Sequence, residues 1–366
     1  MVAAVLQAFC CGSARLTLRF CKGCGPERYA LGHPSYSVES PVPRKEHAMK
    51  KRPLYFDCDP GVDDALALAY LLNSPEVSLV GIGTICGNVD VEQTTENALR
   101  ILALAGRQDV LVAMGERRYL TREYTHRAVQ VHGTNGIGDV ELPPSDLAPT
   151  GESAAEMILR LSDEYEGELE ICAVGPLTNL ARALDLDPSL PQRVKQVVVM
   201  GGAALVPGNV SPVAEANIFC DPEAASAVVR APWDVTLVGL DVTLENVMEE
   251  SHREELLASE QLLVRALGRS LDVYYDFYQP QFGRRCSPLH DPLAAAIAVG
   301  TVKAVDSPWV NVIVDDTEGP GRGQTIADLR GQRLGPVDQE GAHVRMVLKT
   351  DRPLADHLVA RILGRE

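Results

Sequence analysis

The chain has 366 residues, and 46% of them are hydrophobic, which is enough to bury a sizeable core. Its 34 basic and 50 acidic residues give a formal net charge of −16, and no basic stretch is interleaved with aromatic side chains, so a nucleic acid is not an expected partner. No apolar run approaches the ~20 residues of a membrane span. We therefore expect a soluble, cytoplasmic protein without a membrane partner.

Residues 1–48 differ in composition from the rest of the chain. The first 26 residues contain basic side chains but no acid, and Pro, Ser and Gly are frequent over 32–43. The apolar segment 2–10 has no basic region before it, as a secretory signal would require. We interpret 1–48 as an atypical extension that is disordered or precedes the natural start at Met49, and we expect one domain over 49–366.

Nine cysteines are present, and four of them fall within the first 24 residues. The others are scattered singly, at Cys58, Cys86, Cys172, Cys220 and Cys286. An odd, dispersed set indicates buried thiols in a reducing compartment, not a disulfide framework. Cys21 and Cys24 have half the spacing of a zinc site, but no second pair follows to complete four ligands.

From residue 54 onward, the apolar patterns of strands and helices alternate. The predicted strands are 54–58, 77–84, 110–114, 169–174, 194–200 and 235–240, with edge strands at 310–314 and 344–348. The predicted helices are 62–72, 91–105 and 154–165, the segment 251–278 is predicted to be largely helical, and another helix begins over 293–299. This alternation predicts an α/β fold, a single domain with a largely parallel, Rossmann-like open sheet flanked by helices. A polar, glycine-rich connection over 119–149 is long enough to indicate a functional loop.

Four carboxylates fall within eight residues, at Asp57, Asp59, Asp63 and Asp64, between an apolar strand and an apolar helix. A Pro-Gly turn between strand and helix would direct them into the crevice at the carboxyl edge of the sheet. Carboxylates this close repel one another unless a cation lies among them, which favours a hard ion such as Ca²⁺ or Mg²⁺. The alternative is a helix N-terminus that carries acids for dipole reasons. It explains Asp63 and Asp64 but not the two earlier acids.

The pattern D-x-D-P-G-x-D-D resembles the N-terminal signature of the inosine-uridine-preferring nucleoside hydrolases. That family cleaves the N-glycosidic bond of ribonucleosides with the help of a bound Ca²⁺. Other segments that resemble the family follow in the expected order: 174–179 (VGPLTN), 200–202 (MGG) with 208–209 (GN), 215–217 (EAN) and 290–292 (HDP). The resemblance covers about residues 50–365 and implies ribonucleoside hydrolysis to free base and ribose.

The resemblance implies a set of Ca²⁺ ligands from both halves of the chain. The matching positions are Asp59, Asp64, Asp291 and the backbone carbonyl of Val174. Asp59 also matches the general base, which takes the proton of the attacking water. Asp57 lies on the same side of the strand as Asp59. We expect it to orient the metal ligands without itself binding the ion.

The resemblance also implies a set of side chains that hold the ribose hydroxyls. They are Asp63, Asn88, Asn209, Glu215 and Asn217. Glu215 and Asn217 are two residues apart, so they would share one side of an extended strand. Asn209 follows a glycine and, on its own, is equally typical of a turn.

Three further residues are expected near the base. His290 matches the histidine that acts on the leaving base, and histidine titrates in the range that suits a general acid. His132, in the long connection, matches a second family histidine. Tyr278 belongs to an aromatic cluster over 274–278, which could stack on the base or simply belong to the core. Asp241 and Thr243 follow a strand end, and we expect them either to have a structural role or to support the site.

Two other functions are compatible with parts of the sequence. Asp57-x-Asp59 after a strand also resembles the haloacid-dehalogenase phosphatases, for which Lys195 and the acid pair at 315–316 could serve, with Mg²⁺ as the cofactor. That function leaves the acids at 63–64 and the His290-Asp291 pair without a role. A nucleoside-binding protein without turnover would need neither a base at Asp59 nor an acid at His290.

By resemblance to the family we expect the chain to form a homodimer or homotetramer.

Overall fold

An eight-stranded sheet runs through the computed structural model, which describes residues 50–125 and 127–365. From one edge to the other its strands are β10 (Trp309–Val310), β13 (Val344–Met346), β6 (Val235–Val238), β5 (Val194–Met200), β4 (Leu169–Ala173), β1 (Arg52–Cys58), β2 (Val77–Thr84) and β3 (Val112–Met114). All neighbours are parallel except β10, which is antiparallel to β13. The predicted α/β class, with a largely parallel sheet, is confirmed.

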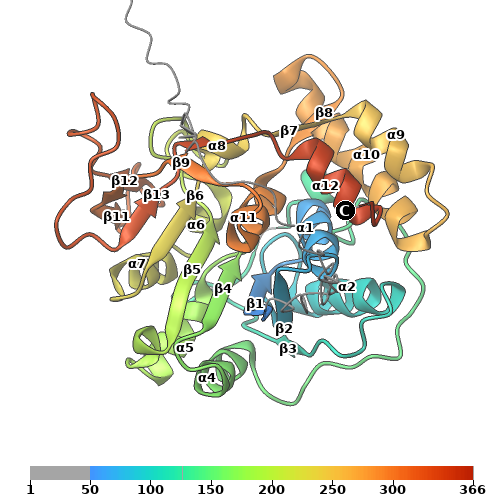
Figure 1. Cartoon of the computed structure of the whole chain (residues 1–366), viewed down its shortest axis with the longest axis horizontal. Coiled ribbons are helices and arrows are strands. Elements are labelled where there is room, and N and C mark those ends of the chain that lie inside the picture. The colour runs from blue at the N-terminus through green and yellow to red at the C-terminus, as the bar shows by residue number, and fades with distance from the viewer. Residues whose placement is uncertain (1–49, 126, 366) are drawn as a thin grey trace, which may run out of the picture. The chain divides into compact units, whose positions relative to one another are not determined.

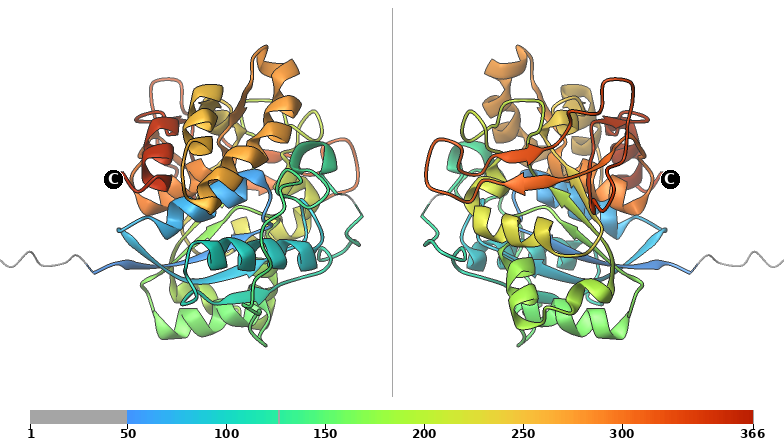
Figure 2. Two further views of the ribbon diagram at one scale, coloured as in Figure 1. Left: turned by 90° about the vertical axis from the view of Figure 1, so that its right-hand side faces the viewer. Right: turned by 90° about the vertical axis from the view of Figure 1, so that its left-hand side faces the viewer.

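Helices cover both faces of the sheet (Figure 1). One face carries α1 (Val62–Leu72), α2 (Val91–Leu104), α10 (Leu262–Phe282), α11 (His290–Val299) and α12 (Ala355–Ile362). The other face carries α4 (Ala154–Glu164), α5 (Thr178–Leu186) and α7 (Pro222–Arg230). Figure 2 shows α1, α10 and α12 on one side of the sheet and α4 on the other. Strands buried on both faces are expected to be almost wholly apolar.

The alternation of side chains along β1 shows how this strand joins two cores. Leu54, Phe56 and Cys58 pack into the core under α1 and α11, whereas Tyr55 packs into the core under α4. All four side chains are fully buried. Because both faces are covered, the only polar residue of the strand's second half, Asp57, is buried as well.

Short strand pairs and helices complete the described chain. The strand pairs are β7 (Val247–Glu249) with β8 (Cys286–Pro288), β9 (Ala304–Asp306) with β14 (Lys349–Thr350), and β11 (Val312–Val314) with β12 (Thr325–Ala327). The remaining helices are α3 (Val129–His132), α6 (Ala216–Cys220), α8 (Leu240–Thr243), α9 (Glu250–Leu257) and a 3₁₀ turn, Leu190–Gln192. None of the described helices is long and apolar enough to cross a membrane.

Several predicted boundaries were wrong. The segment 251–278 is largely helical, as predicted, but it consists of two helices, α9 and α10, separated by a turn in which the side chain of Ser259 accepts from the backbone N–H of Gln261. The strand predicted at 344–348 as an edge strand is β13, which lies inside the sheet between β6 and β10. The segment 310–314 contributes to two different sheets, since β10 and β11 separate at residue 311.

Contacts group Met49–Glu366 into one unit. The predictions for residues 1–48, including their four cysteines, lie outside the described residues. The five cysteines of the described part are free thiols, and four of them are buried, with Cys220 partly exposed.

Candidate active site

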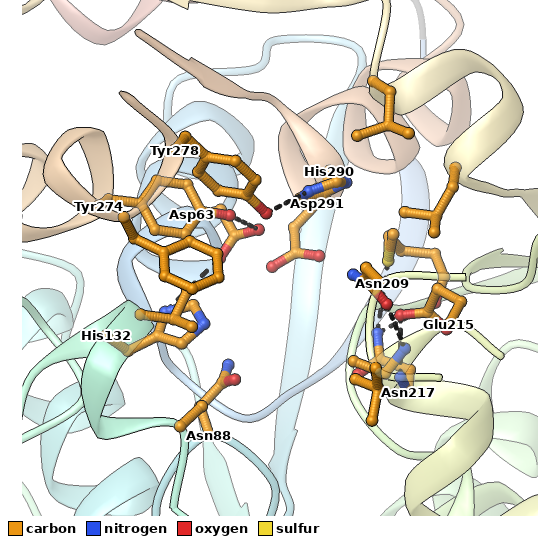
Figure 3. Close-up of a pocket in the computed structure, with 18 of the residues that line it drawn as sticks. Asp63, Asn88, His132, Asn209, Glu215, Asn217, Tyr274, Tyr278, His290 and Asp291 are labelled. Carbon is orange, nitrogen blue, oxygen red and sulfur yellow. Dashed lines mark hydrogen bonds and ion pairs between the residues drawn. The ribbon is translucent and has the colours of Figure 1, made fainter. Parts of the chain in front are cut away.

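A pocket of about 610 Å³ opens at the carboxyl edge of the sheet. Asn88 comes from the segment after β2, Val174 directly follows β4, and Met200 ends β5. Figure 3 shows acids and aromatic side chains on one side of the pocket and Asn209, Glu215 and Asn217 on the other. This is the position at which open parallel sheets bind ligands.

Three buried carboxylates meet at one wall of the pocket. Oxygens of Asp63, Asp64 and Asp291 all lie within 4.8 Å of one another, and the three residues are at most 5% exposed. Asp63 and Asp64 come from the first turn of α1 and Asp291 from the first turn of α11, two helices that pack together. No lysine or arginine within the described residues forms an ion pair with them. Burial raises the pKa of Asp64 to about 7 and raises the pKa values of Asp63 and Asp291.

The Asp64 carboxylate is fixed by the turn that precedes α1. Its Oδ2 accepts from the backbone N–H of Gly61 at 2.9 Å, and its Oδ1 accepts from the N–H of Asp59 at 3.1 Å. Gly61 is the N-cap of α1, and its N–H would otherwise lack a partner at the start of the helix. Asp64 therefore does cap the helix, as the dipole alternative predicted, but it also meets Asp291 from a segment more than 200 residues away.

Asp59 lies beside this cluster in a narrow slot. Its Oδ2 accepts from the N–H of Asn88 at 2.7 Å, while its Oδ1 is buried without a hydrogen-bond partner. A Cβ atom on Gly175 would lie 2.6 Å from Oδ1, and one on Gly87 would collide with Oδ2, so the carboxylate is enclosed by two glycines. Burial, reinforced by the charge of Asp64, holds the pKa of Asp59 well above its usual value.

The donor set fits a hard divalent cation. Asp64 and Asp291, two of the four predicted ligands, belong to the carboxylate cluster, and Asp59 offers an unpaired buried oxygen next to it. The carbonyl of Val174, the fourth, lines the same pocket but accepts from Nδ2 of Asn217 at 2.7 Å. Asp63, predicted to bind ribose, is the third member of the cluster. Carboxylate and carbonyl oxygens are the ligands that Ca²⁺ and Mg²⁺ take.

Three of the predicted ribose side chains, those of Asn209, Glu215 and Asn217, lie on the opposite wall, but not on an extended strand. Glu215 is the N-cap of α6, and its carboxylate accepts from the N–H groups of Asn217, Ile218 and Gly202 at 2.8–3.1 Å. The strand prediction was therefore wrong, since a helix begins at this point. Asn209 accepts from the N–H of Ala216 at 3.0 Å, which holds the preceding loop against α6. Burial raises the pKa of Glu215 to about 7.

His290 is held between two hydroxyl groups. Its Nε2 lies 2.9 Å from the hydroxyl of Tyr278, and its Nδ1 lies 2.8 Å from Oγ1 of Thr243. Thr243 thus supports the site, as expected from its place after β6. Asp241 instead accepts from the backbone of 204–205 and anchors that loop. Burial lowers the pKa of His290 to about 4, so the imidazole is neutral at pH 7 in the absence of ligand.

His132 lies on α3, a helix within the long connection that the sequence did not predict. Its Nδ1 accepts from the N–H of Val62 at 3.1 Å, and its ring packs against Tyr274 with centroids 5.4 Å apart. Burial lowers the pKa of His132 to about 3. His132 is therefore neutral, and the long connection closes one side of the pocket.

Asp57 lies behind the pocket and does not line it. Its carboxylate accepts from the hydroxyl of Tyr55 at 2.8 Å and from Nδ2 of Asn179 at 3.1–3.2 Å. Asn179 also bonds the carbonyl of Thr84 and the N–H of Glu116. Asp57 therefore ties β1 to α5 and to the ends of β2 and β3, and it makes no direct bond to the acid cluster.

A profile of the family described as inosine-uridine preferring nucleoside hydrolase matches residues 54–355. The chain belongs to this family. It is 39% identical to a probable uridine nucleosidase 2 of Arabidopsis thaliana over 285 residues, 78% of this chain and 85% of that protein. It is 36% identical to the pyrimidine-specific ribonucleoside hydrolase RihA of Shewanella woodyi over 283 residues, 76% of this chain and 89% of that protein.

Solved structures of nucleoside hydrolases share the fold. A plant nucleoside hydrolase, PpNRh1, superimposes with a TM-score of 0.78 at 33% identity, over 86% of this chain and 99% of that one. A purine-preferring ribonucleoside hydrolase from Gardnerella vaginalis gives 0.77 at 34% identity, over 86% and 98%. This chain is accordingly an N-glycosyl hydrolase that cleaves the N-glycosidic bond of ribonucleosides.

Further pocket residues of this nucleoside hydrolase come from α10, where Tyr274 and Phe277 belong to the aromatic cluster expected over 274–278 and Gln281 was not predicted. Tyr274 donates its hydroxyl to Oδ2 of Asp63 at 2.9 Å, and Phe277 and Gln281 line the pocket with it. Together with Tyr278 they occur at helical spacing along α10, so the sequence did contain a periodic signal for one face. Leu240 and Leu244, from α8 and its end, carry no such signal.

Proposed function

We propose that this hydrolase binds Ca²⁺ at the acid cluster, uses Asp59 as the general base and His290 as the acid for the leaving base, and prefers uridine. The observation that carries the proposal is the group of buried oxygens from Asp63, Asp64 and Asp291, next to the unpaired oxygen of Asp59. Burying several like charges without compensation is costly. A divalent cation would relieve that cost.

The cation is assigned to Asp59, Asp64, Asp291 and the Val174 carbonyl. When bound, Ca²⁺ would supply the positive charge that makes a neighbouring water a stronger acid. Asp59 suits the role of base because Asn88 and two glycines hold one carboxylate oxygen in place while the other has no hydrogen bond. A base must be fixed within hydrogen-bond reach of the proton that it takes.

Ribose is assigned to Asp63, Asn88, Asn209, Glu215 and Asn217, which are spread over the two walls of the pocket. Vicinal hydroxyls can donate to carboxylates and accept from amides. The Asn217 amide already reaches the Val174 carbonyl, so the ribose and cation sites share a boundary. Cleavage of the C1′–N bond of a ribonucleoside held there would pass through an oxocarbenium-like state.

The base is assigned to the aromatic side of the pocket, near His290, Tyr278 and His132. Departure of the base leaves negative charge beside His290, and such a charge favours the imidazolium form over the neutral form. The Tyr278 and Thr243 hydroxyls hold both ring nitrogens in hydrogen bonds and so fix the orientation of the ring. Orientation of this kind is what a general acid requires.

Uridine is proposed because the two relatives described above, at 39% and 36% identity, are named as a uridine nucleosidase and a pyrimidine-specific hydrolase. A homodimer or homotetramer is proposed as well, to be measured by light scattering.

The phosphatase alternative requires Lys195 to bind phosphate, but this lysine does not lie at the pocket. Lys195 lies near the start of β5, at the opposite edge of the sheet, and pairs with Glu170 at 2.7 Å.

The test is ribose release from uridine, cytidine, inosine, adenosine and guanosine, with protein treated with EGTA and then supplied with Ca²⁺ or Mg²⁺. We expect turnover to be lost on chelation and restored by Ca²⁺, with the highest kcat/KM for uridine. Turnover that survives chelation would refute the cation, and a higher kcat/KM for inosine would refute the base preference. Binding of nucleosides without ribose release would support the non-catalytic alternative.

A second test measures Ca²⁺ uptake by calorimetry. Asp291→Asn should abolish Ca²⁺ uptake, while Asp185→Asn, at an exposed carboxylate, should not.

A further inference from the structure

Asp221 is a buried acid outside the pocket that no step above uses. It is 0% exposed, and no lysine or arginine among the described residues pairs with it. It lies between α6, which carries the proposed ribose residue Asn217, and α7, whose first turn it caps by accepting from the N–H of Ala224 at 3.0 Å. A serine or threonine would suffice as a cap, so the carboxylate requires another explanation.

The second carboxylate oxygen of Asp221 bonds two segments that are distant in sequence. Oδ2 accepts from Oγ1 of Thr178 at 2.7 Å and from the backbone N–H of Leu120 at 2.8 Å. Thr178 is the first residue of α5 and is fully buried. Leu120 lies at the start of the long connection that leads to His132.

Two parallel hydrogen bonds therefore join the same two segments. Asn217 donates to the Val174 carbonyl at 2.7 Å, and four residues further along each segment Thr178 donates to Asp221. The first bond lines the pocket, whereas the second is buried behind it. A single bond between two segments leaves them free to pivot, and the second bond removes that freedom.

We propose that Asp221 is a positioning residue that holds α6 against the turn after β4, so that the Asn217 amide and the Val174 carbonyl stay in place for ribose and cation. This inference rests on the proposed roles of those two residues. Small displacements matter because catalysis depends on the reacting groups being held within a fraction of an ångström.

Two variants separate positioning from capping. Asp221→Ser keeps a good cap for α7, but its side chain is too short to reach Thr178 and Leu120. Thr178→Val removes only the hydroxyl of the buried bond and preserves the shape of the side chain, which keeps the test available if the first variant folds poorly. Ser153→Ala is the matched control, because Ser153 caps α4 through Glu156 and has no bond to the pocket.

The measurements are hydrogen exchange of residues 216–220 and the kinetic constants for uridine in the Ca²⁺-loaded protein. We expect faster exchange there in both variants, and a loss of about tenfold in kcat/KM. The double variant should be no worse than Asp221→Ser, since both remove the same bond. Ser153→Ala should lower thermal stability without either effect.

Exchange at the wild-type rate in both variants would overturn the inference, and so would kinetic constants within twofold of wild type, which would leave Asp221 as a cap alone. If wild-type protein releases no ribose from any nucleoside, the proposed function fails. The exchange measurement then decides the role of Asp221 without turnover.

Discussion

A substitution at a glycine next to Asp59 can displace the carboxylate of this proposed base without removing it. A Cβ on Gly175 would lie 2.6 Å from Oδ1 of Asp59, whereas ordinary contacts begin at 3.4 Å. In Gly175→Ala the carboxylate must therefore retreat by roughly 0.8 Å, because contacts shorter than the van der Waals distance are strongly repulsive. The φ angle of Gly175 lies outside the left-handed region, so an alanine backbone is not strained there.

The expected loss follows from that displacement. A misplacement of about 1 Å in a catalytic group can cost roughly 10²-fold in rate, which is about 2.7 kcal/mol of activation free energy. Overpacking of this kind should also cost about 1–3 kcal/mol of stability. We expect kcat for ribose release from uridine to fall by about 10²-fold, while the protein remains folded by circular dichroism.

The matched control is Gly151→Ala. A Cβ on Gly151 meets nothing within 4 Å, and its φ angle is likewise outside the left-handed region. This variant should keep full activity. If Gly175→Ala keeps kcat within threefold of wild type, Asp59 either tolerates the shift or is not the base, and the reasoning from the slot is refuted.

Three further outcomes test the assignments. Asp59→Asn preserves the size of the side chain and should lower kcat about 10²-fold or more, the usual scale for a general base; near-full activity would remove it from the mechanism. His290→Ala should reduce hydrolysis of inosine far more than that of p-nitrophenyl riboside, whose phenolate leaves without a proton, and equal losses would assign His290 to packing. Chelation with EGTA should lower the unfolding temperature, because an ion at 100 times its Kd stabilises the folded state by about 2.7 kcal/mol; an unchanged midpoint would contradict a cation site.

Local sequence patterns were sufficient to predict those features that one continuous segment of the chain determines. The first strand, the Pro-Gly turn and the helix over 62–72 were predicted with nearly their observed bounds, since apolar runs and turn residues determine them locally. The helix that carries His290 was expected only from 293. Its observed start at His290 includes Pro292, and proline is tolerated in a first turn because the N–H groups there have no partner within the helix.

Features that depend on distant segments could not be predicted in this way. Glu215 is an N-cap although glutamate is not among the preferred cap residues, so the start of α6 has no strong local signal. The hydroxyl of Tyr274 reaches Asp63 across 211 residues of sequence. The position of β13 between β6 and β10 is likewise a property of topology, not of the pattern of its own residues.

The acids of the site are buried together because helix N-termini hold them. Asp64, Asp291 and Glu215 each lie at the start of a helix, where free N–H groups and the positive end of the helix dipole favour a carboxylate. These contacts offset only part of the cost of burial, since the pKa values of all three remain raised. A divalent cation in contact with the Asp64 and Asp291 carboxylates would offset the rest of that cost. Binding of the cation should therefore stabilise α1 and α11 against each other more than any element at the opposite edge, and hydrogen exchange with and without Ca²⁺ should show the largest protection in those two helices.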